Sequence, residues 1–241
     1  MLHRLTTGGK TIGHDLYYLD SGANYLDGTT DMTRTLHFGQ PTEKQMECYT
    51  LILRGILSVE MTAFQSNDII TGYRIGALLQ QYFNARHYSS RHISFGHGVS
   101  HGQGVIEGGI NISDVYSIAN EVPIKAGMVV TLEPRIYLEE QWGIRLENVY
   151  AVEEDENSWI HFKPLTLIPY SRRMIHFNQL TKQKISWITD YHQRCLENVG
   201  RGLWMKNEIR TIFPNQCNSL VDLFSSHDQL NKENSFLLFD R

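Results

Sequence analysis

The stretch LDSGANYLDGTTDMTRT, Leu19–Thr35, establishes how this chain begins to fold. An apolar, aromatic segment, residues 16–19, leads into it, and Met32–Phe38 reads as a second strand. A Ser-Gly pair and an Asp-Gly pair lie between the two segments, so the pattern predicts a strand, a turn and a returning strand. We expect this hairpin to bring Asp20 and Asp31 onto the same end of a sheet.

Three later phrases each carry one more side chain that can bind a metal ion. They are GHGV with His97, AGMVVTLEP with Glu133 and GIRLENV with Glu147. Two divalent ions held close together need carboxylates to neutralise their mutual repulsion, and imidazole also suits Mn, Zn or Fe. The set Asp20, Asp31, His97, Glu133 and Glu147 therefore predicts a two-metal centre of the kind that peptidases use.

The four phrases together resemble those of the pita-bread metallopeptidases. The segments DGTTDMTRTLHFG and KPLTLIPYSRRMI, the second spanning residues 163–175, are similar to the X-Pro aminopeptidase (aminopeptidase P) branch. The following LTKQKISWITDYHQRCLENVG continues this likeness, which runs over residues 16–200. The resemblance is to the catalytic and C-terminal segments of the long eukaryotic cytosolic enzymes. It implies an α+β pita-bread fold: a curved, mostly antiparallel sheet backed by helices, in two pseudo-symmetric halves.

The resemblance also implies a function. It is that of a metalloaminopeptidase that removes an N-terminal residue preceding proline, by attack of a metal-bridged hydroxide on the scissile carbonyl. The five donors would hold two divalent ions, Mn²⁺ first, with Zn²⁺ or Co²⁺ as alternatives. Glu133 would also take the proton from the nucleophile, and His101 or water would assist the tetrahedral intermediate. The implied partners are short peptides with a penultimate proline and a second copy of the chain.

Two of these assignments have alternatives in the sequence itself. His101 offers a competing alignment, in which HGVSHG matches the HGxGHG frame found elsewhere in the family. That alignment requires a deletion before Glu107, whereas His97 needs none, so His97 is preferred as the metal ligand. Glu147 could instead form a surface ion pair with Arg145, which would contribute little to stability.

Three positions depart from the family pattern. Ile106 stands where the family carries a His that contacts substrate and transfers protons, and such a group typically contributes about 10²–10⁴-fold in rate. Ile93 replaces a second His, and Arg135 replaces a Gly. We expect Ile106 to be buried, so that a His placed there would cost roughly 1–3 kcal/mol. These departures support an alternative function: a catalytically impaired or inactive homologue that binds metal, peptide or a partner subunit.

The family pattern predicts how the chain is divided. Residues 1–160 are expected to form the catalytic domain, with a truncated N-terminus, and residues 161–203 a family extension packed on it. Residues 204–241 are an unassigned tail without sustained periodicity, for which poor order is one expectation. Capping and apolar spacing predict helices after Thr42, over Gly72–Ala85 and over Thr181–Val199. Strands are predicted over Met128–Leu132 and Gly143–Val152.

Bulk properties set limits on partners and location. The 241 residues are 41% hydrophobic with a net charge of −4, which leaves no basic footprint for nucleic acid or an anionic membrane. No apolar run approaches the roughly 18 residues of a membrane span, and MLHRLTTGGK has no apolar core of a secretory signal. Cys48, Cys195 and Cys217 are scattered and odd in number, which fits a reducing compartment. A cytoplasmic location is therefore expected.

Overall fold

The computed structural model describes residues 16–88, 94–117 and 121–200. The expectations for Ile93 and for the tail 204–241 lie outside these ranges. The chain divides into two compact units, one of Met1–Thr166 with Arg173–His176 and one of Leu167–Arg172 with Phe177–Arg241. The described elements give an α+β fold of mostly antiparallel strands with few helices, as predicted. No helix in these ranges is long and apolar enough to cross a membrane.

The first unit opens with the predicted hairpin. Strands β1 (Leu16–Tyr25) and β2 (Gly28–His37) pair antiparallel along their whole length. Asp20 pairs with Thr33, and Asp31 pairs with Gly22. The two carboxylates are therefore diagonal neighbours on one face, since residues two apart on a strand share a face.

The hairpin differs from the prediction in one respect, because the two carboxylates lie along the ribbon and not at its end. The Ser-Gly pair lies inside β1, and the chain turns instead between Tyr25 and Gly28. A Cβ added to Gly22 would lie 2.8 Å from a methyl carbon of Val105. This glycine therefore allows the segment before β5 to approach β1 closely. Glycine inside a strand often marks such a close approach and not a turn.

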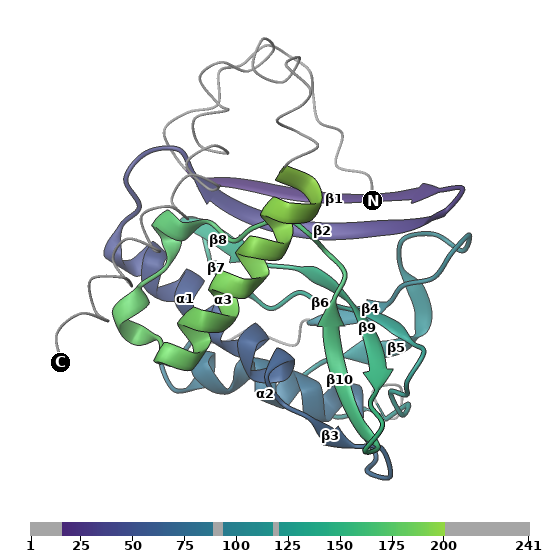
Figure 1. Cartoon of the computed structure of the whole chain (residues 1–241). Helices are drawn as coiled ribbons and strands as arrows, with labels where there is room; N and C mark the ends of the chain where they lie inside the picture. The colour runs from purple at the N-terminus through teal and green to yellow at the C-terminus, as the bar shows by residue number, and fades with distance from the viewer. Residues whose placement is uncertain (1–15, 89–93, 118–120, 201–241) are drawn as a thin grey trace, which may run out of the picture. The chain divides into compact units, whose positions relative to one another are not determined.

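The central sheet has six antiparallel strands in the order β3-β10-β9-β6-β4-β5 (Figure 1). Their bounds are Phe64–Gln65 (β3), Gly96–Gly98 (β4), Glu107–Ile112 (β5), Val129–Leu132 (β6), Asn148–Glu154 (β9) and Trp159–Pro164 (β10). A separate hairpin joins β7 (Arg135–Leu138) to β8 (Trp142–Arg145). Strand β6 confirms the prediction for residues 128–132.

Helix α1 (Glu43–Glu60) begins at the predicted capping box. The backbone N–H of Gln45 donates to Thr42 Oγ1 at 3.3 Å, and the Thr42 N–H donates to Gln45 Oε1 at 2.7 Å. Most of the helix is buried, and at its end Glu60 Oε1 accepts a hydrogen bond from the Tyr150 hydroxyl at 2.7 Å. The helix therefore packs on more than one side, since its buried residues include the consecutive positions Leu51, Ile52 and Leu53.

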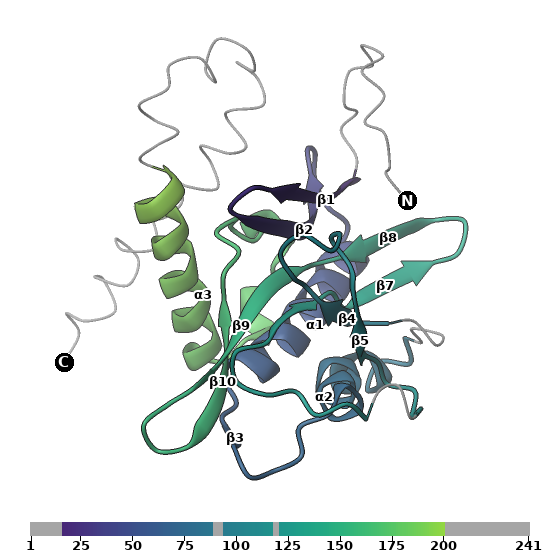
Figure 2. The ribbon, with the colours of Figure 1, turned by 90° about the vertical axis from the view of Figure 1, so that its right-hand side faces the viewer.

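Helix α2 (Gly72–Asn84) lies beside α1 in the same unit (Figure 2). Its N-cap is Thr71, whose hydroxyl accepts from the Arg74 N–H, and its bounds confirm the prediction to within one residue. Gly72 and Gly76 let the helix approach the end of β5 and the residue after it, since a Cβ at either position would lie under 2.5 Å from backbone atoms of Asn111 or Ser113.

The predicted strand over residues 143–152 is wrong as a single element. It is divided at Leu146 and Glu147 into β8, which pairs with β7, and β9, which pairs with β6 and β10. The Glu147 N–H donates to the Thr33 carbonyl at 3.0 Å, which forms an isolated bridge to β2. A continuous apolar pattern cannot show that a strand changes partners, because the partners come from distant sequence.

The second unit is built around helix α3 (Lys182–Cys195), which lies within the helix predicted over Thr181–Val199 and has Thr181 as its N-cap. A π-helical turn, Leu196–Gly200, continues it. The Tyr170 N–H donates to His192 Nε2 at 3.0 Å, and the Tyr191 hydroxyl donates to the Ile168 carbonyl at 2.8 Å. These bonds tie the helix to the segment Leu167–Arg172 within this unit.

Replacing Gly96 by alanine is expected to destabilise the first unit. A Cβ at Gly96 would lie 2.1 Å from the Thr131 carbonyl oxygen, where β4 runs beside β6, so the backbone must shift. Such overpacking costs about 1–3 kcal/mol, which urea unfolding measures. Gly28→Ala is the matched control, because nothing lies within 4 Å of a Cβ there. Equal stability of the two variants would contradict the close approach of β4 and β6.

Candidate metal centre

An imidazole and two carboxylates form the centre of the site. His97, on β4, places Nε2 3.3 Å from Asp31 Oδ2 and 3.7 Å from Glu133 Oε1. Its Nδ1 lies 2.8 Å from the Gly98 carbonyl. A proton on Nδ1 would satisfy that carbonyl and leave the Nε2 lone pair facing the carboxylates, which is the tautomer that a metal ligand needs.

Glu147 completes this cluster from the break between β8 and β9. Its side chain is 2% exposed, and its Oε2 accepts a hydrogen bond from Thr33 Oγ1 at 2.6 Å. Ligand atoms of Asp31, His97 and Glu147 all lie within 4.8 Å of one another. Two buried carboxylates and one imidazole at this separation fit a divalent cation, because buried charges need a partner.

Arg145 lies among the carboxylates. Its guanidinium pairs with Asp20 and approaches Glu133 Oε2 at 3.5 Å and Glu147 Oε2 at 3.8 Å. Its Nε donates to Thr33 Oγ1 at 2.9 Å. The alternative pair between Arg145 and Glu147 is present at 3.8 Å, but the two side chains are 11% and 2% exposed, so its expected place on the surface is wrong. The pKa of Arg145 is raised, because the nearby acidic groups, Glu147 first, outweigh the effect of burial.

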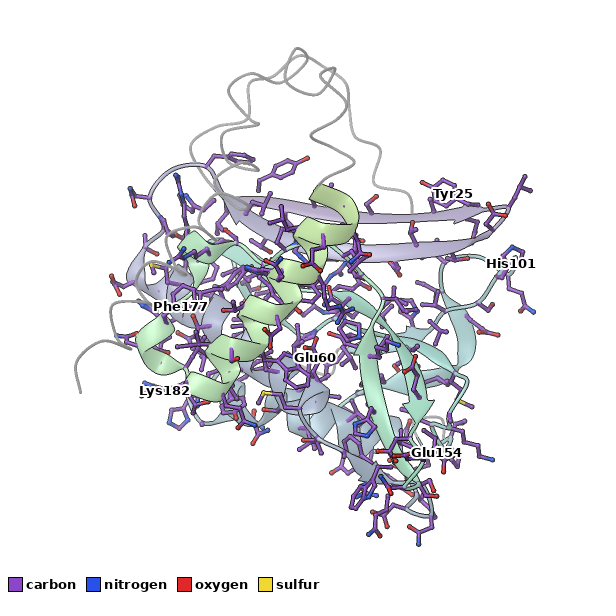
Figure 3. The ribbon with its side chains drawn as sticks, viewed as in Figure 1. Tyr25, Glu60, His101, Glu154, Phe177 and Lys182 are labelled. Carbon is purple, nitrogen blue, oxygen red and sulfur yellow. The ribbon has the colours of Figure 1, made fainter. Side chains whose placement is uncertain are left out.

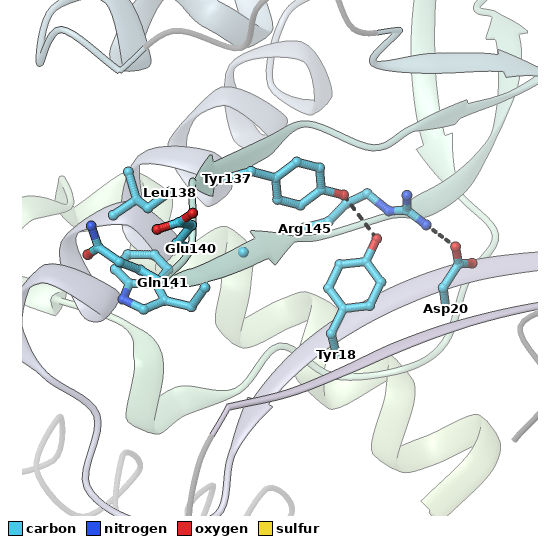
Figure 4. A pocket seen from close by; sticks show the side chains of 9 residues that line it. Tyr18, Asp20, Tyr137, Leu138, Glu140, Gln141 and Arg145 are labelled. Atoms are coloured by element: carbon cyan, nitrogen blue, oxygen red, sulfur yellow. Dashed lines mark hydrogen bonds and ion pairs between the residues drawn. The ribbon is translucent and has the colours of Figure 1, made fainter. Parts of the chain in front are cut away.

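Asp20 lies at the edge of the cluster and borders a pocket of about 650 Å³ (Figure 4). Tyr18 and Tyr137 face each other across this pocket, with their hydroxyl oxygens 3.3 Å apart. The Arg145 guanidinium lies 5.2 Å from the centre of the Tyr18 ring, within the range of a cation–π contact. The pocket therefore joins an aromatic wall to the charged cluster.

Glu133 follows β6 and is held from two sides. One oxygen, Oε1, faces His97, while Oε2 accepts a hydrogen bond from Arg135 Nη1 at 2.9 Å. The neighbouring Thr131 Oγ1 accepts the His97 N–H at 3.1 Å, which fixes β4 against β6 next to the site.

The electrostatics of the metal-free cluster favour bound protons. Burial, followed by the charges of Glu133 and Asp31, raises the pKa of Glu147 to about 8. Burial also raises the pKa of Glu133, against the opposing effect of Arg145 and Arg135. Burial alone would lower the pKa of His97, but hydrogen bonds to Asp31 and the Gly98 carbonyl outweigh it and raise that pKa to about 8.

Stability of the metal-free chain is expected to fall as pH rises. Both Glu147 and His97 have folded-state pKa values above their ordinary ones, 4.5 and 6.5, so the folded state binds more protons than the unfolded state. The Glu147 contribution is lost from about pH 4.5 to 8, and that of His97 from about pH 6.5 to 8. Thermal melts of chelated protein between pH 5 and 8.5 measure this. A midpoint that rises over this interval would contradict it.

His101 and Ile106 occupy different surroundings from the cluster. His101 is exposed and places Nε2 2.7 Å from the Leu26 carbonyl, beside the end of the β1–β2 hairpin near Tyr25 (Figure 3). The geometry thus favours His97 over His101 as the imidazole of the cluster. Ile106 is 68% exposed, so the expectation that it is buried is wrong. It directly precedes β5, next to the Val105 side chain that lies against Gly22.

Sequence reasoning missed Thr33, which bonds both Glu147 and Arg145. A signal was present, because Thr33 lies two residues after Asp31 on a predicted strand and therefore shares its face. The Tyr18–Tyr137 pair had no such signal, since its residues are 119 positions apart in the chain.

Comparison with protein families gives two matches. The model of "Metallopeptidase family M24" matches residues 1–154, and that of the "C-terminal region of peptidase_M24" matches residues 158–212. Among curated proteins, "Xaa-Pro aminopeptidase 1" of Dictyostelium discoideum is 36% identical over 225 residues, which cover 86% of this chain and 35% of that protein. "Probable Xaa-Pro aminopeptidase P" of Coccidioides posadasii is 37% identical over 205 residues, which cover 80% of this chain and 32% of that protein.

Solved structures agree. An X-prolyl aminopeptidase from Caenorhabditis elegans, described as a cytosolic enzyme with a di-nuclear active site, is 31% identical with a TM-score of 0.74. The match covers 88% of this chain and 33% of that one. A prolidase from Pyrococcus furiosus is 30% identical with a TM-score of 0.54. That match covers 64% of this chain and 41% of the prolidase chain.

The curated relatives are about three times as long as the matched region, since this chain spans 35% and 32% of the two named above. The resemblance found in the sequence is confirmed by the family match, and the pita-bread fold by the structural neighbours. The chain belongs to metallopeptidase family M24 and is a homologue of its Xaa-Pro aminopeptidases.

Proposed function

We propose that this chain is a metal-dependent aminopeptidase that removes an N-terminal residue preceding proline. The observation that carries the proposal is the convergence of Asp31, His97 and Glu147, with Glu133 3.7 Å from the same imidazole. Four sequence phrases that are far apart in the chain supply these side chains. The relatives named Xaa-Pro aminopeptidase support the class of substrate.

Asp20, Asp31, His97, Glu133 and Glu147 would hold two divalent ions. Their donor chemistry, oxygen with one nitrogen, fits Mn²⁺, Zn²⁺ or Co²⁺. Bound there, the ions would lower the pKa of a water nucleophile and polarise the scissile carbonyl. Mn²⁺ is the first choice, and the di-nuclear site described for the C. elegans neighbour supports the number of ions.

The residues of the chain would orient and move protons. Glu133, whose pKa burial raises, would accept the proton of the nucleophile and pass it to the leaving nitrogen. Thr33 would keep Glu147 in place through its 2.6 Å hydrogen bond. His101 would assist the tetrahedral intermediate only after leaving the Leu26 carbonyl, so water is the better candidate for that role.

A second candidate function is that of an inactive homologue that binds metal, a peptide or a partner subunit. Two observations favour it. An exposed hydrocarbon side chain, Ile106, stands at the position where the family carries a proton-transferring His, and a second guanidinium, Arg135, holds Glu133. Neither side chain can transfer a proton at neutral pH.

One experiment separates the two functions. Chelated protein is reloaded with Mn²⁺, its metal content is measured, and it is incubated with Arg-Pro-Pro and with Arg-Ala-Pro as the matched peptide. Release of arginine from Arg-Pro-Pro alone supports the aminopeptidase. Bound metal without cleavage of either peptide supports the inactive homologue.

We also propose a cytosolic setting and a homodimer. The C. elegans neighbour is described as cytosolic, and the described part of this chain holds no candidate membrane span. Size-exclusion chromatography with light scattering tests the dimer directly, since a mass of one chain at micromolar concentration would contradict it.

A further inference from the structure

Glu147 lies at a break between two strands that pair with different partners. The register of β7 and β8 ends at Arg145, and that of β6 and β9 begins at Asn148, so Glu147 belongs to neither ladder. The ligands of a metal site must be held within about 0.5 Å of their productive positions. Contacts from outside these two ladders must therefore fix the Glu147 carboxylate.

Two consecutive residues of β2 supply such contacts. The Thr33 carbonyl accepts the Glu147 N–H at 3.0 Å, and the Thr33 hydroxyl donates to Glu147 Oε2 at 2.6 Å. Arg34 comes next and points to the opposite face, because side chains alternate along a strand. Its Nη1 donates to the carbonyls of Glu147 at 2.5 Å and Thr33 at 2.9 Å. Strand β2 thus holds Glu147 by its carboxylate from one face and by its carbonyl from the other.

The Arg34 side chain uses both arms of its guanidinium at this break. Its Nη2 donates to Asn148 Oδ1 at 2.6 Å, while Nη1 holds the Glu147 carbonyl. Arg34 is 1% exposed and Asn148 is fully buried, so these bonds form away from water. A guanidinium presents its N–H groups in a rigid planar fork, whereas the lysine ammonium is a compact point charge. The fork therefore fixes two successive residues at once, which sets the path of the chain through Glu147.

We propose that Arg34 is a positioning residue for the metal centre, which aims the Glu147 carboxylate by fixing the Glu147 backbone at the strand break. The carboxylate then meets Asp31 and His97, and ligand atoms of the three residues lie within 4.8 Å of one another. Arg34 acts through Glu147 and not on an ion, since it points to the face of β2 opposite Asp31. The inference rests on the proposed metal centre and goes beyond it by naming the buried cation that orients one ligand.

The test uses the full chain, stripped by chelation and titrated with Mn²⁺, with free Mn²⁺ measured by electron paramagnetic resonance. Arg34→Lys keeps the charge but cannot hold both acceptors, and is expected to weaken Mn²⁺ binding about 10–100-fold, as loss of an outer-shell partner does. In a Glu147→Gln background the same change should add little, because Arg34 acts through that carboxylate. Tyr150→Phe is the matched control, since it removes a buried 2.7 Å hydrogen bond to Glu60 on the same strand as Asn148. It should lower the thermal midpoint and leave the Mn²⁺ affinity unchanged.

Several outcomes would overturn the proposal. An Arg34→Lys protein that folds and binds Mn²⁺ as wild type does would refute the role of Arg34 and leave the proposed peptidase function intact. Losses of Mn²⁺ affinity that merely follow the loss of stability in Arg34→Lys and Tyr150→Phe alike would refute it too. If Arg34→Lys does not fold, Asn148→Leu takes its place, because it removes one acceptor of the guanidinium. About tenfold weaker binding is then expected, and wild-type affinity would refute the proposal. No Mn²⁺ bound by wild type would refute the metal centre and this inference together.

Discussion

Replacing Glu147 by glutamine is expected to abolish most of the stabilisation that Mn²⁺ gives to this chain. At an ion concentration about 100 times the dissociation constant, mass action stabilises the folded state by about 2.7 kcal/mol. For a chain of this size that is a rise of about 5–10 °C in the midpoint of thermal unfolding. Glutamine cannot supply the anionic oxygen, so the rise should shrink to about 1 °C or less.

The same change should not harm the metal-free fold. The side-chain oxygen of glutamine can still accept the Thr33 hydroxyl, and a buried negative charge beside Glu133 and Asp31 is removed. The chelated variant should therefore melt at or above the chelated wild type near pH 8. Differential scanning fluorimetry with and without Mn²⁺ measures both effects.

Glu154→Gln is the matched control, because Glu154 is an exposed carboxylate at the far end of β9, the strand that follows Glu147. It should keep the full response to Mn²⁺. A Glu147→Gln protein with an undiminished response would show that the ion binds elsewhere. The metal centre proposed from Asp31, His97 and Glu147 would then be wrong.

Replacing Ile106 by histidine is expected to raise turnover of Arg-Pro-Pro by about 10–10³-fold. The gain is what one added acid–base group typically supplies. Ile106 directly precedes β5, and its neighbour Val105 lies against Gly22, the residue of β1 that pairs with Asp31. The expected gain requires that an imidazole at position 106 reach a substrate bound at the charged cluster, which is what the turnover measurement decides.

The structure changes the expected cost of this substitution. Because Ile106 is 68% exposed, a polar side chain there stays in water, and the change in the free energy of unfolding should lie within about 0.5 kcal/mol. Ile69→His is the matched control, since Ile69 is 66% exposed. It should leave both turnover and stability unchanged.

Two results would count against the proposed role of position 106. One is an Ile106→His protein that folds, loads Mn²⁺ and stays inert, which favours the inactive homologue. The other is wild-type turnover that the His variant does not increase. In that case another group already performs the proton transfer, and His101 would be examined next.

The sequence predicted elements whose signals are local. Thr42 and Gln45 stand three residues apart, the spacing at which each side chain reaches the other's backbone, so the start of α1 could be read directly. The hairpin over residues 16–37 followed from apolar segments around an Asp-Gly turn. The donor chemistry was likewise visible, because carboxylates and imidazole are a choice of residue type.

Tertiary structure alone decided how those donors meet. The sequence could not show that the chain breaks at Leu146 and places Glu147 beside Thr33, because β8 and β9 find their partners in different sheets. Nor could it show that Arg145 reaches Asp20, 125 residues away, or that Arg135 holds Glu133.

The exposure of Ile106 was also decided by the tertiary structure alone. A single apolar residue before a strand has no periodic pattern that would predict its burial or exposure. The sequence gives each residue type directly, and residue type limits which chemistry a site can perform. Distances and burial arise only when remote segments pack, because they depend on every neighbour at once. The sequence by itself therefore determined the kinds of metal donor, and the packing of β1, β2, β4, β6 and β8 decided which charges face which.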